Sequence, residues 1–223
     1  MYSEITLIIP AKNESESLPK VLNELKKYNV NKNVILERKD ILTLNSIKKY
    51  KCKIIFQKNK GYGGALIEGI KSVNTKYFCI FNADGSFNPN EIKRMFKKIN
   101  KKNADFVFST RYEKNCGSDD DTIITLIGNF IFTMLGKIFF RLELSDILYT
   151  YVLGKTKKAK KLKLKYLDFR FCIELPIKAN KKKFKLITSK SHERSRIGGQ
   201  KKVNAFKDGL LILSGMIALF FNL

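Results

Sequence analysis

Short apolar runs alternate with amphipathic, helix-like segments over the first 112 residues, and few architectures accommodate such an alternation. The apolar runs, each followed by polar or turn-forming residues, lie at residues 5–9, 34–36, 53–56, 77–81 and 105–109. Between them, apolar residues at helical spacing (residues 18–25 and 92–99) and a glycine-rich opening (residues 63–71) predict helices. Strands joined through helices need right-handed crossovers, so the sequence predicts an α/β fold with a mostly parallel sheet.

The composition excludes several other classes of protein. A hydrophobic content of 44% over 223 residues excludes a disordered chain. The four cysteines lie far apart without a CxxC pair, which excludes a disulfide scaffold and a zinc ribbon. Because the chain has a single histidine, His192, we expect neither a His-Asp-Ser triad nor a multi-histidine metal site. Residues 1–4 lack a basic leader, so we expect a reduced, intracellular protein without a cleaved signal peptide.

Net charge is the most unusual property of the composition. The chain has 44 basic and 20 acidic residues, a formal charge of +24. Such a surplus is compatible with nucleic acid, an anionic membrane or phosphorylated substrates, and equally with a lysine-rich solvated surface. The cluster at residues 155–165 fits either a membrane contact or a loop without a partner. Because no nucleic-acid-binding motif or aromatic stacking platform accompanies the charge, we expect no nucleic-acid partner.

The second half of the chain contains two long apolar stretches, residues 123–140 and 205–223. At 1.5 Å per residue, their apolar runs of roughly 13–18 residues span about 20–27 Å, less than a hydrocarbon core of about 30 Å. We therefore expect two helices that lie in the membrane interface, or a marginal anchor. The alternative for each stretch is a buried core helix.

Three polar segments follow predicted strands: residues 10–14, 82–86 and 109–112. Ligands of open α/β sheets bind beyond the carboxyl ends of the strands. The sequence therefore predicts that these segments meet at one ligand site.

Their order and spacing resemble glycosyltransferase family 2, the inverting transferases with a GT-A fold, and within it the dolichyl- or polyprenyl-phosphate mannose synthase type. The resemblance is carried by residues 5–14 (ITLIIPAKNE), 59–70 (NKGYGGALIEGI), 82–86 (NADGS), 109–111 (STR) and 193–202 (ERSRIGGQKK). It implies a Rossmann-like sheet flanked by helices, divided into a nucleotide-sugar half (1–112), an acceptor-side half (113–204) and a hydrophobic, membrane-associated helix (205–223).

The resemblance also implies a donor site that binds a GDP- or UDP-sugar with Mg²⁺ or Mn²⁺. Asp84 stands where a hard, oxygen-seeking cation needs a ligand, with Asn82 and Ser86 beside it. The implied substrate-binding residues are Pro10, Asn13, Glu14, Glu37, Asn59, Gly61, Asn82, Ala83, Arg194, Arg196, Lys201 and Lys202. The four cations among them surround two glycines and suit a diphosphate. Asp84, Arg111 and Asp146 are the candidate catalytic residues.

Two positions depart from the family pattern. Asn82 replaces the first aspartate of Asp-x-Asp, which removes one anionic metal ligand. Residues 36–40 (LERKD) replace an Asp-Asp-Gly-Ser segment, with Glu37 as the candidate contact to the base. A catalytically degenerate family member is therefore one alternative.

The acceptor decides between two further alternatives. A sugar hydroxyl needs a general base, for which Asp146 is the candidate, although a helix or loop cap explains that residue equally well. A lipid phosphate is already an anion and needs no base. We expect transfer of a hexose to polyprenyl phosphate at the cytoplasmic face of the inner membrane, with a peripheral or C-terminally anchored enzyme. The alternative is extension of a lipid-linked or surface polysaccharide or lipopolysaccharide sugar.

Overall fold

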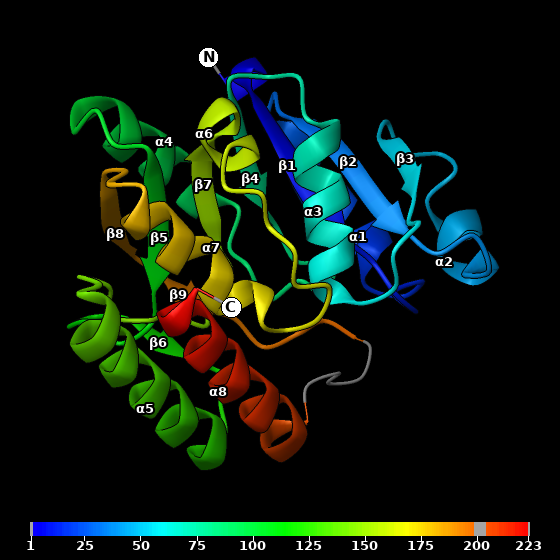
Figure 1. Ribbon diagram of the computed structural model, residues 1–223. Helices are drawn as coiled ribbons and strands as arrows, with labels where there is room; N and C mark the ends of the chain where they lie inside the picture. The colour runs from blue at the N-terminus through cyan, green and yellow to red at the C-terminus, as the bar shows by residue number, and fades with distance from the viewer. Residues whose placement is uncertain (1, 199–203, 223) are drawn as a thin grey trace.

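A seven-stranded sheet forms the centre of the protein, and the computed structural model describes residues 2–198 and 204–222 (Figure 1). Its strand order is β3-β2-β1-β4-β7-β5-β8. The strands are β1 (Ile5–Pro10), β2 (Asn31–Leu36), β3 (Lys53–Phe56), β4 (Tyr77–Ile80), β5 (Phe106–Thr110), β7 (Val152–Lys155) and β8 (Leu186–Lys190). All pair in parallel except β7, which runs antiparallel between β4 and β5. The predicted α/β fold with a mostly parallel sheet is confirmed.

Helices cover both faces of this sheet. They are α1 (Leu18–Glu24), α2 (Ile41–Ser46), α3 (Tyr62–Ser72), α4 (Asn90–Lys101), α5 (Ile123–Phe140), α6 (Thr156–Lys160), α7 (Phe171–Lys181) and α8 (Ala205–Phe221). Ile5, Leu7 and Ile9 of β1 join a core with α1 and α4, whereas Ile8 joins a second core with α3 and α7. Burial on both faces explains why the strands are continuous apolar runs in the sequence.

Elements from the second half of the chain complete the sheet. β7 and β8 both come from residues after 112, and a short parallel pair, β6 (Gly117–Ser118) with β9 (His192–Glu193), lies beside them. Gly154 allows β7 to enter the sheet, because a Cβ there would lie 2.5 Å from the Phe106 ring and 2.7 Å from the Phe78 ring. The apolar pattern did not predict this strand.

The two long apolar stretches form α5 and α8, which pack against each other and against α7 (Figure 1). Within the described residues, α5 is the one helix long and apolar enough to cross a membrane, and 22% of it is buried. One side of α8 enters a small core through Ile212, Met216 and Leu219. Each helix thus buries one side and leaves the other exposed, which differs from a fully buried core helix.

The lysine-rich stretch at residues 155–165 lies away from α5 and α8. It begins at the end of β7 and forms α6, at the opposite end of the molecule from the two apolar helices (Figure 1). Lys155 pairs with Asp105 at 3.1 Å, and the Lys160 ammonium donates to the Val73 carbonyl. α6 therefore does not continue the surface of α5 and α8, and the membrane contact considered for this stretch stays a prediction.

Candidate active site

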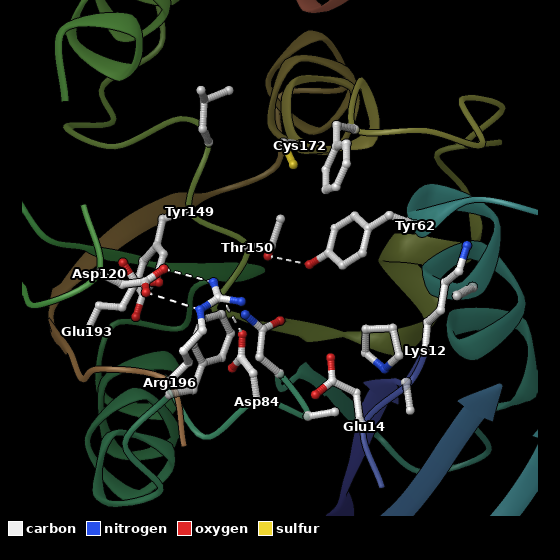
Figure 2. A pocket seen from close by; sticks show the side chains of 18 of the residues that line it. Lys12, Glu14, Tyr62, Asp84, Asp120, Tyr149, Thr150, Cys172, Glu193 and Arg196 are labelled. Atoms are coloured by element: carbon white, nitrogen blue, oxygen red, sulfur yellow. Dashed lines mark hydrogen bonds and ion pairs between the residues drawn. The ribbon is translucent and has the colours of Figure 1, made fainter. Parts of the chain in front are cut away.

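A cavity of about 460 Å³ opens at the carboxyl ends of β1, β2, β4 and β5 (Figure 2). Its position is the one where open α/β sheets bind ligands. The predicted site residues that line it are Pro10, Glu14, Glu37, Gly61, Asn82, Ala83, Asp84, Arg111 and Arg196. The fold thus brings the three polar segments together, although residues 15–108 separate the first from the last.

Asp84 is held by the turn that follows β4. Its Oδ1 accepts hydrogen bonds from the Ser86 backbone N–H at 3.0 Å and from the Ser86 hydroxyl at 2.7 Å. Between them, Gly85 has a φ of +86°, which favours glycine. The Asn82 amide lies 3.5 Å from the Ser86 hydroxyl. The turn therefore fixes one carboxylate oxygen and leaves Oδ2 for another partner.

The segment after β9 is attached to this same turn. The Arg194 backbone N–H donates to the Ser86 carbonyl, and the Ile197 N–H donates to the Asp84 carbonyl. The Arg194 guanidinium pairs with Glu24 of α1 at 2.8 and 3.0 Å and also donates to the Gly85 and Phe87 carbonyls. Arg194 is not among the cavity-lining residues, so it anchors the segment and does not occupy the predicted substrate-binding position.

Arg196 extends from this segment into the cavity. Its guanidinium donates to both carboxylate oxygens of Asp120, at 3.1 and 2.8 Å. The hydrogen bond to Asp120 raises the pKa of Arg196, so its charge is constant over the whole physiological range. The same guanidinium lies 3.9 Å from Oδ2 of Asp84. Figure 2 shows Arg196 between the two carboxylates.

Arg111 is the centre of a buried charge network at the cavity wall. Its guanidinium donates to Asp146 at 2.8 and 3.1 Å and to Glu193 at 2.8 Å, and it lies 3.4 Å from Asp121. It also stacks 4.4 Å from the Tyr149 ring centroid. These three carboxylates hold the buried guanidinium at the edge of the cavity.

Asp146 lies behind Arg111 and does not line the cavity. It is 1% exposed, and its Oδ1 also accepts from the Asn129 amide of α5 at 2.8 Å. The structure therefore does not place Asp146 where a general base would meet an acceptor. It acts on the site through Arg111, as a positioning residue.

Three cavity carboxylates were not predicted, Asp120, Asp121 and Glu193. Burial raises the pKa of Glu193 above its ordinary value. Its Oε2 accepts from the Ser118 hydroxyl at 2.6 Å. Glu193 opens the segment 193–202 in which only the cations and glycines had been considered. A glutamate directly before a cationic segment was the available signal.

The far side of the cavity contains Glu37, which follows β2. Its carboxylate pairs with Lys12 at 3.7 Å and with Lys39 at 3.2 Å. Lys12 and Gln57 also line this region. Glu37 therefore lines the cavity, and its contact to the nucleobase stays a prediction.

Two predicted substrate-binding residues, Asn13 and Asn59, and the predicted metal ligand Ser86 do not line the cavity. The Asn13 backbone N–H donates to Asp40 at 2.7 Å, and Asn59 donates its backbone and amide N–H groups to Glu68. Neither asparagine is among the cavity-lining residues. Ser86 supports Asp84 from the turn. Lys201 and Lys202 lie outside the described residues.

A divalent cation fits the donor set at Asp84. The described residues contain no group of three or more His, Cys, Asp or Glu side chains that could hold a metal. Mg²⁺, however, is commonly bound through one or two carboxylates while substrate phosphates and water complete its shell. Asp84 Oδ2 and the Asn82 amide oxygen can supply the protein's share, and a diphosphate would supply further oxygens.

The remaining wall of the cavity is largely apolar. Tyr62 stacks on Phe169 with ring centroids 5.2 Å apart, and its hydroxyl lies 2.7 Å from Thr150 Oγ1. Leu148 and Cys172 continue this wall. Burial raises the pKa of Cys172 to about 12, which keeps its thiol protonated and unreactive. The cavity thus combines a charged half with an apolar, aromatic half (Figure 2).

A family model described as Glycosyl transferase family 2 matches residues 6–163, which includes β1, the Asp84 turn and Arg111. The chain belongs to glycosyl transferase family 2. The polyprenyl-phosphate mannose synthase type within the family is not resolved by this match.

Two similar proteins come from Methanocaldococcus jannaschii, and both are described as uncharacterized. One is 27% identical over 132 residues, which cover 57% of this chain and 54% of the relative. The other is 33% identical over 119 residues, which cover 48% of this chain and 52% of the relative. The chain spans about half the length of these curated relatives.

Solved structures share the fold of this family 2 chain. A mycobacterial protein superposes with a TM-score of 0.76 at 10% identity, covering 97% of this chain and 74% of its own. Glucosyl-3-phosphoglycerate synthase from Mycobacterium tuberculosis, in complex with Mn²⁺, UDP and glucosyl-3-phosphoglycerate, gives 0.74 at 12% identity, covering 97% and 80%. The same enzyme with Mg²⁺ and UDP gives 0.71 at 11% identity, covering 97% and 79%. The predicted GT-A fold is confirmed.

Proposed function

We propose that this family 2 protein is an inverting hexosyltransferase, which moves a hexose from a nucleotide diphosphate sugar to polyprenyl phosphate at a membrane surface. The observation that carries the proposal is an apolar face, formed by exposed side chains of α5 and α8 close to the cavity. We define it by Ile124, Ile127, Phe130, Ile131, Met134 and Ile138 of α5 and by Phe206, Leu210, Leu213, Ile217 and Phe221 of α8.

The apolar face begins at the cavity. Thr125, in the first turn of α5, lines the cavity. Phe130, which follows it along the same helix, is 66% exposed. Asn129, on the same helix, donates to Asp146 and so connects α5 to the Arg111 network. A lipid whose chains lie against α5 would therefore have its phosphate close to Arg111. Large exposed apolar patches are typical of protein or membrane contacts, and the adjoining cavity with Arg111 at its wall favours a lipid that carries a phosphate.

Cations at the other end of the apolar face also favour a membrane. A second hollow, of about 320 Å³, lies where α5 and α8 end, and Phe139 and Phe220 line it together with Arg141 and Lys181. Aromatic rings beside arginine and lysine are typical of the headgroup level of a bilayer. The net charge of +24 adds a general attraction to anionic lipid.

The charged half of the cavity suits the donor. A divalent cation bound at Asp84 would neutralise the diphosphate as it leaves. Arg196 and Arg111 bring two fixed positive charges to the same region, and Asp146 keeps the second of them in place. Glu37 and Lys12 lie where the nucleoside would bind. An acceptor phosphate is already ionised, so the residues need only orient it and exclude water.

The test is a transfer assay with labelled UDP-glucose, UDP-galactose and GDP-mannose, with a polyprenyl phosphate in liposomes as acceptor. Label that enters the organic phase, depends on Mn²⁺ or Mg²⁺ and disappears with Asp84→Asn would support the proposal. Transfer only to a water-soluble acceptor would contradict the lipid acceptor. Absence of transfer with every donor would favour a degenerate family member.

A second candidate is transfer to a sugar hydroxyl of a lipid-linked or surface glycan. Glu193 favours it, because this buried carboxylate with a raised pKa lines the cavity and could accept a proton. A hydroxyl acceptor requires such a base, whereas a phosphate does not. A glycan acceptor that replaces polyprenyl phosphate in the assay would identify this alternative.

A further inference from the structure

Arg196 lies in contact with two carboxylates that belong to different parts of the chain. Asp120, just before α5, accepts two hydrogen bonds from its guanidinium, and Asp84, after β4, has its Oδ2 3.9 Å away. In Figure 2 the guanidinium lies at the side of Asp84 that faces the cavity. This is the oxygen that the turn leaves without a bond from Ser86.

The backbone that carries Arg196 is fixed on both sides. Before it, Arg194 is bound to Glu24 and to two backbone carbonyls. After it, the Ile197 N–H donates to the Asp84 carbonyl, and the Ile197 side chain covers Gly85, where an added Cβ would lie 2.4 Å from it. A change of partner at Arg196 therefore needs only a rotation of its side chain.

We propose that Arg196 is an internal counter-cation, which occupies the cation-binding side of Asp84 while the donor is absent and moves to the diphosphate when metal and donor arrive together. The inference rests on the proposed function, since it assigns the donor diphosphate as the second partner of Arg196. Beyond that function, free metal and Arg196 compete for Asp84.

The competition follows from charge. A guanidinium about 4 Å from Asp84 repels a divalent cation that approaches the same oxygen. Asn82 adds no negative charge, so Asp84 is the one carboxylate that the Asn82–Ser86 turn offers to a metal. A diphosphate reverses the balance, because it supplies anionic oxygens to both the metal and Arg196. Metal alone should therefore bind weakly, and metal with nucleotide should bind cooperatively.

The experiment measures Mn²⁺ alone, through the electron paramagnetic resonance signal of the free ion, and then UDP and GDP in the presence of Mn²⁺ by calorimetry. Arg196→Gln should bind Mn²⁺ alone about tenfold more tightly than the wild type and should bind the preferred diphosphate about tenfold more weakly. Opposite signs in the two measurements distinguish this exchange from a simple loss of structure.

Two controls locate the effect. In the double variant Asp84→Asn/Arg196→Gln the gain in Mn²⁺ affinity should disappear, because it acts through Asp84. Lys12→Gln removes the same charge from the same cavity, but Lys12 pairs with Glu37, so its Mn²⁺ affinity should stay close to that of the wild type. Arg196→Met supplies a second neutral variant if the glutamine variant does not fold.

Mn²⁺ affinity that is unchanged or lower in the neutral variants would overturn the inference, and so would a gain that survives in the double variant or that Lys12→Gln reproduces. Failure of the proposed function has a different result: the wild type would bind neither UDP nor GDP with Mn²⁺. The Mn²⁺ measurement without nucleotide tests Arg196 in either case.

Discussion

The carboxylate of Asp146 accepts two hydrogen bonds from the guanidinium of Arg111, at 2.8 Å from Nε to Oδ2 and at 3.1 Å from Nη2 to Oδ1. Asp146 is buried and Arg111 reaches the cavity, so the buried carboxylate holds the positive charge of Arg111 in a fixed position at the site. Asn129 of α5 bonds to the same carboxylate. The pair thus also connects the cavity to the apolar face.

Asp146→Ala should lower the free energy of unfolding by about 3–5 kcal/mol, because removal of one partner leaves a buried charge with weaker compensation. Urea unfolding of the two proteins measures the difference. Asp119→Ala is the control: its pair with His192 is half exposed, so a loss of less than about 1 kcal/mol is expected. Equal losses in both variants would contradict the special role of Asp146.

Glu193→Gln should change stability in a pH-dependent way. Burial raises the pKa of Glu193 above its ordinary 4.5, so above that pH the folded protein binds more protons than the unfolded chain at this residue. This contribution to stability is complete below the unfolded pKa and is lost as pH rises through the folded pKa. The variant should therefore become more stable relative to the wild type over the pH range that begins at the ordinary pKa of 4.5 and extends upward through the raised pKa of Glu193. Urea unfolding across this range measures it, and a constant or opposite difference would refute the shift.

Asp84→Asn should lower the rate of transfer by about 10²–10³-fold, since it removes the charge that would hold the metal against the diphosphate. The asparagine oxygen can still accept from Ser86, so the free energy of unfolding should change by less than about 1 kcal/mol. Initial rates with the preferred donor provide the measurement. Wild-type rates in this variant would eliminate Asp84 as the metal ligand.

Phe130→Glu should weaken binding to anionic liposomes by about tenfold or more, because a charge replaces a large apolar side chain in the membrane contact. Leu42→Glu is the matched control: Leu42 is 75% exposed, but it lies on α2, on the other side of the molecule from α5 and α8 (Figure 1). Liposome sedimentation compares the variants. Equal binding of the two would contradict the apolar face as the membrane contact.

Gly61→Ala should destabilise the protein by about 1–3 kcal/mol. Gly61 has a φ of +100°, and a Cβ there would lie 2.2 Å from the Leu167 carbonyl oxygen. Gly128→Ala should instead stabilise it by about 0.5–1 kcal/mol, because nothing lies within 4 Å of that Cβ in the interior of α5. Thermal unfolding of both variants tests the contrast, and a shift of the same sign in both would contradict it.

Periodicity predicted most of the first half of the fold because these strands are buried on both faces. β3 has the predicted bounds, 53–56, and β1 and β4 differ from prediction by one residue at one end. β5 is shifted by one residue, and β2 begins at Asn31, earlier than the predicted residue 34. β7 was missed because its Gly154 adds no apolar signal, although the Phe78 and Phe106 rings require a glycine there. α7 was missed because Pro176 interrupts its apolar pattern while the surrounding core holds it in place.

The candidate site was predictable where polar residues follow strands directly. Glu14, Asp84 and Arg111 meet in one cavity for that reason. The partners of the arginines were not predictable, because they are tertiary contacts: Arg111 reaches Glu193 across 82 positions, and Arg196 reaches Asp120 across 76. Neither contact leaves a local pattern in the sequence.

The most direct test of a nucleotide-sugar site is calorimetry of the wild-type protein with UDP, GDP and their sugars, with and without Mn²⁺. The account predicts that one diphosphate binds, that Mn²⁺ strengthens its binding, and that Glu37→Gln weakens it by removing the contact expected for the base. Absence of binding across the whole panel would contradict the assignment of Asp84, Arg196 and Glu37 to a donor site.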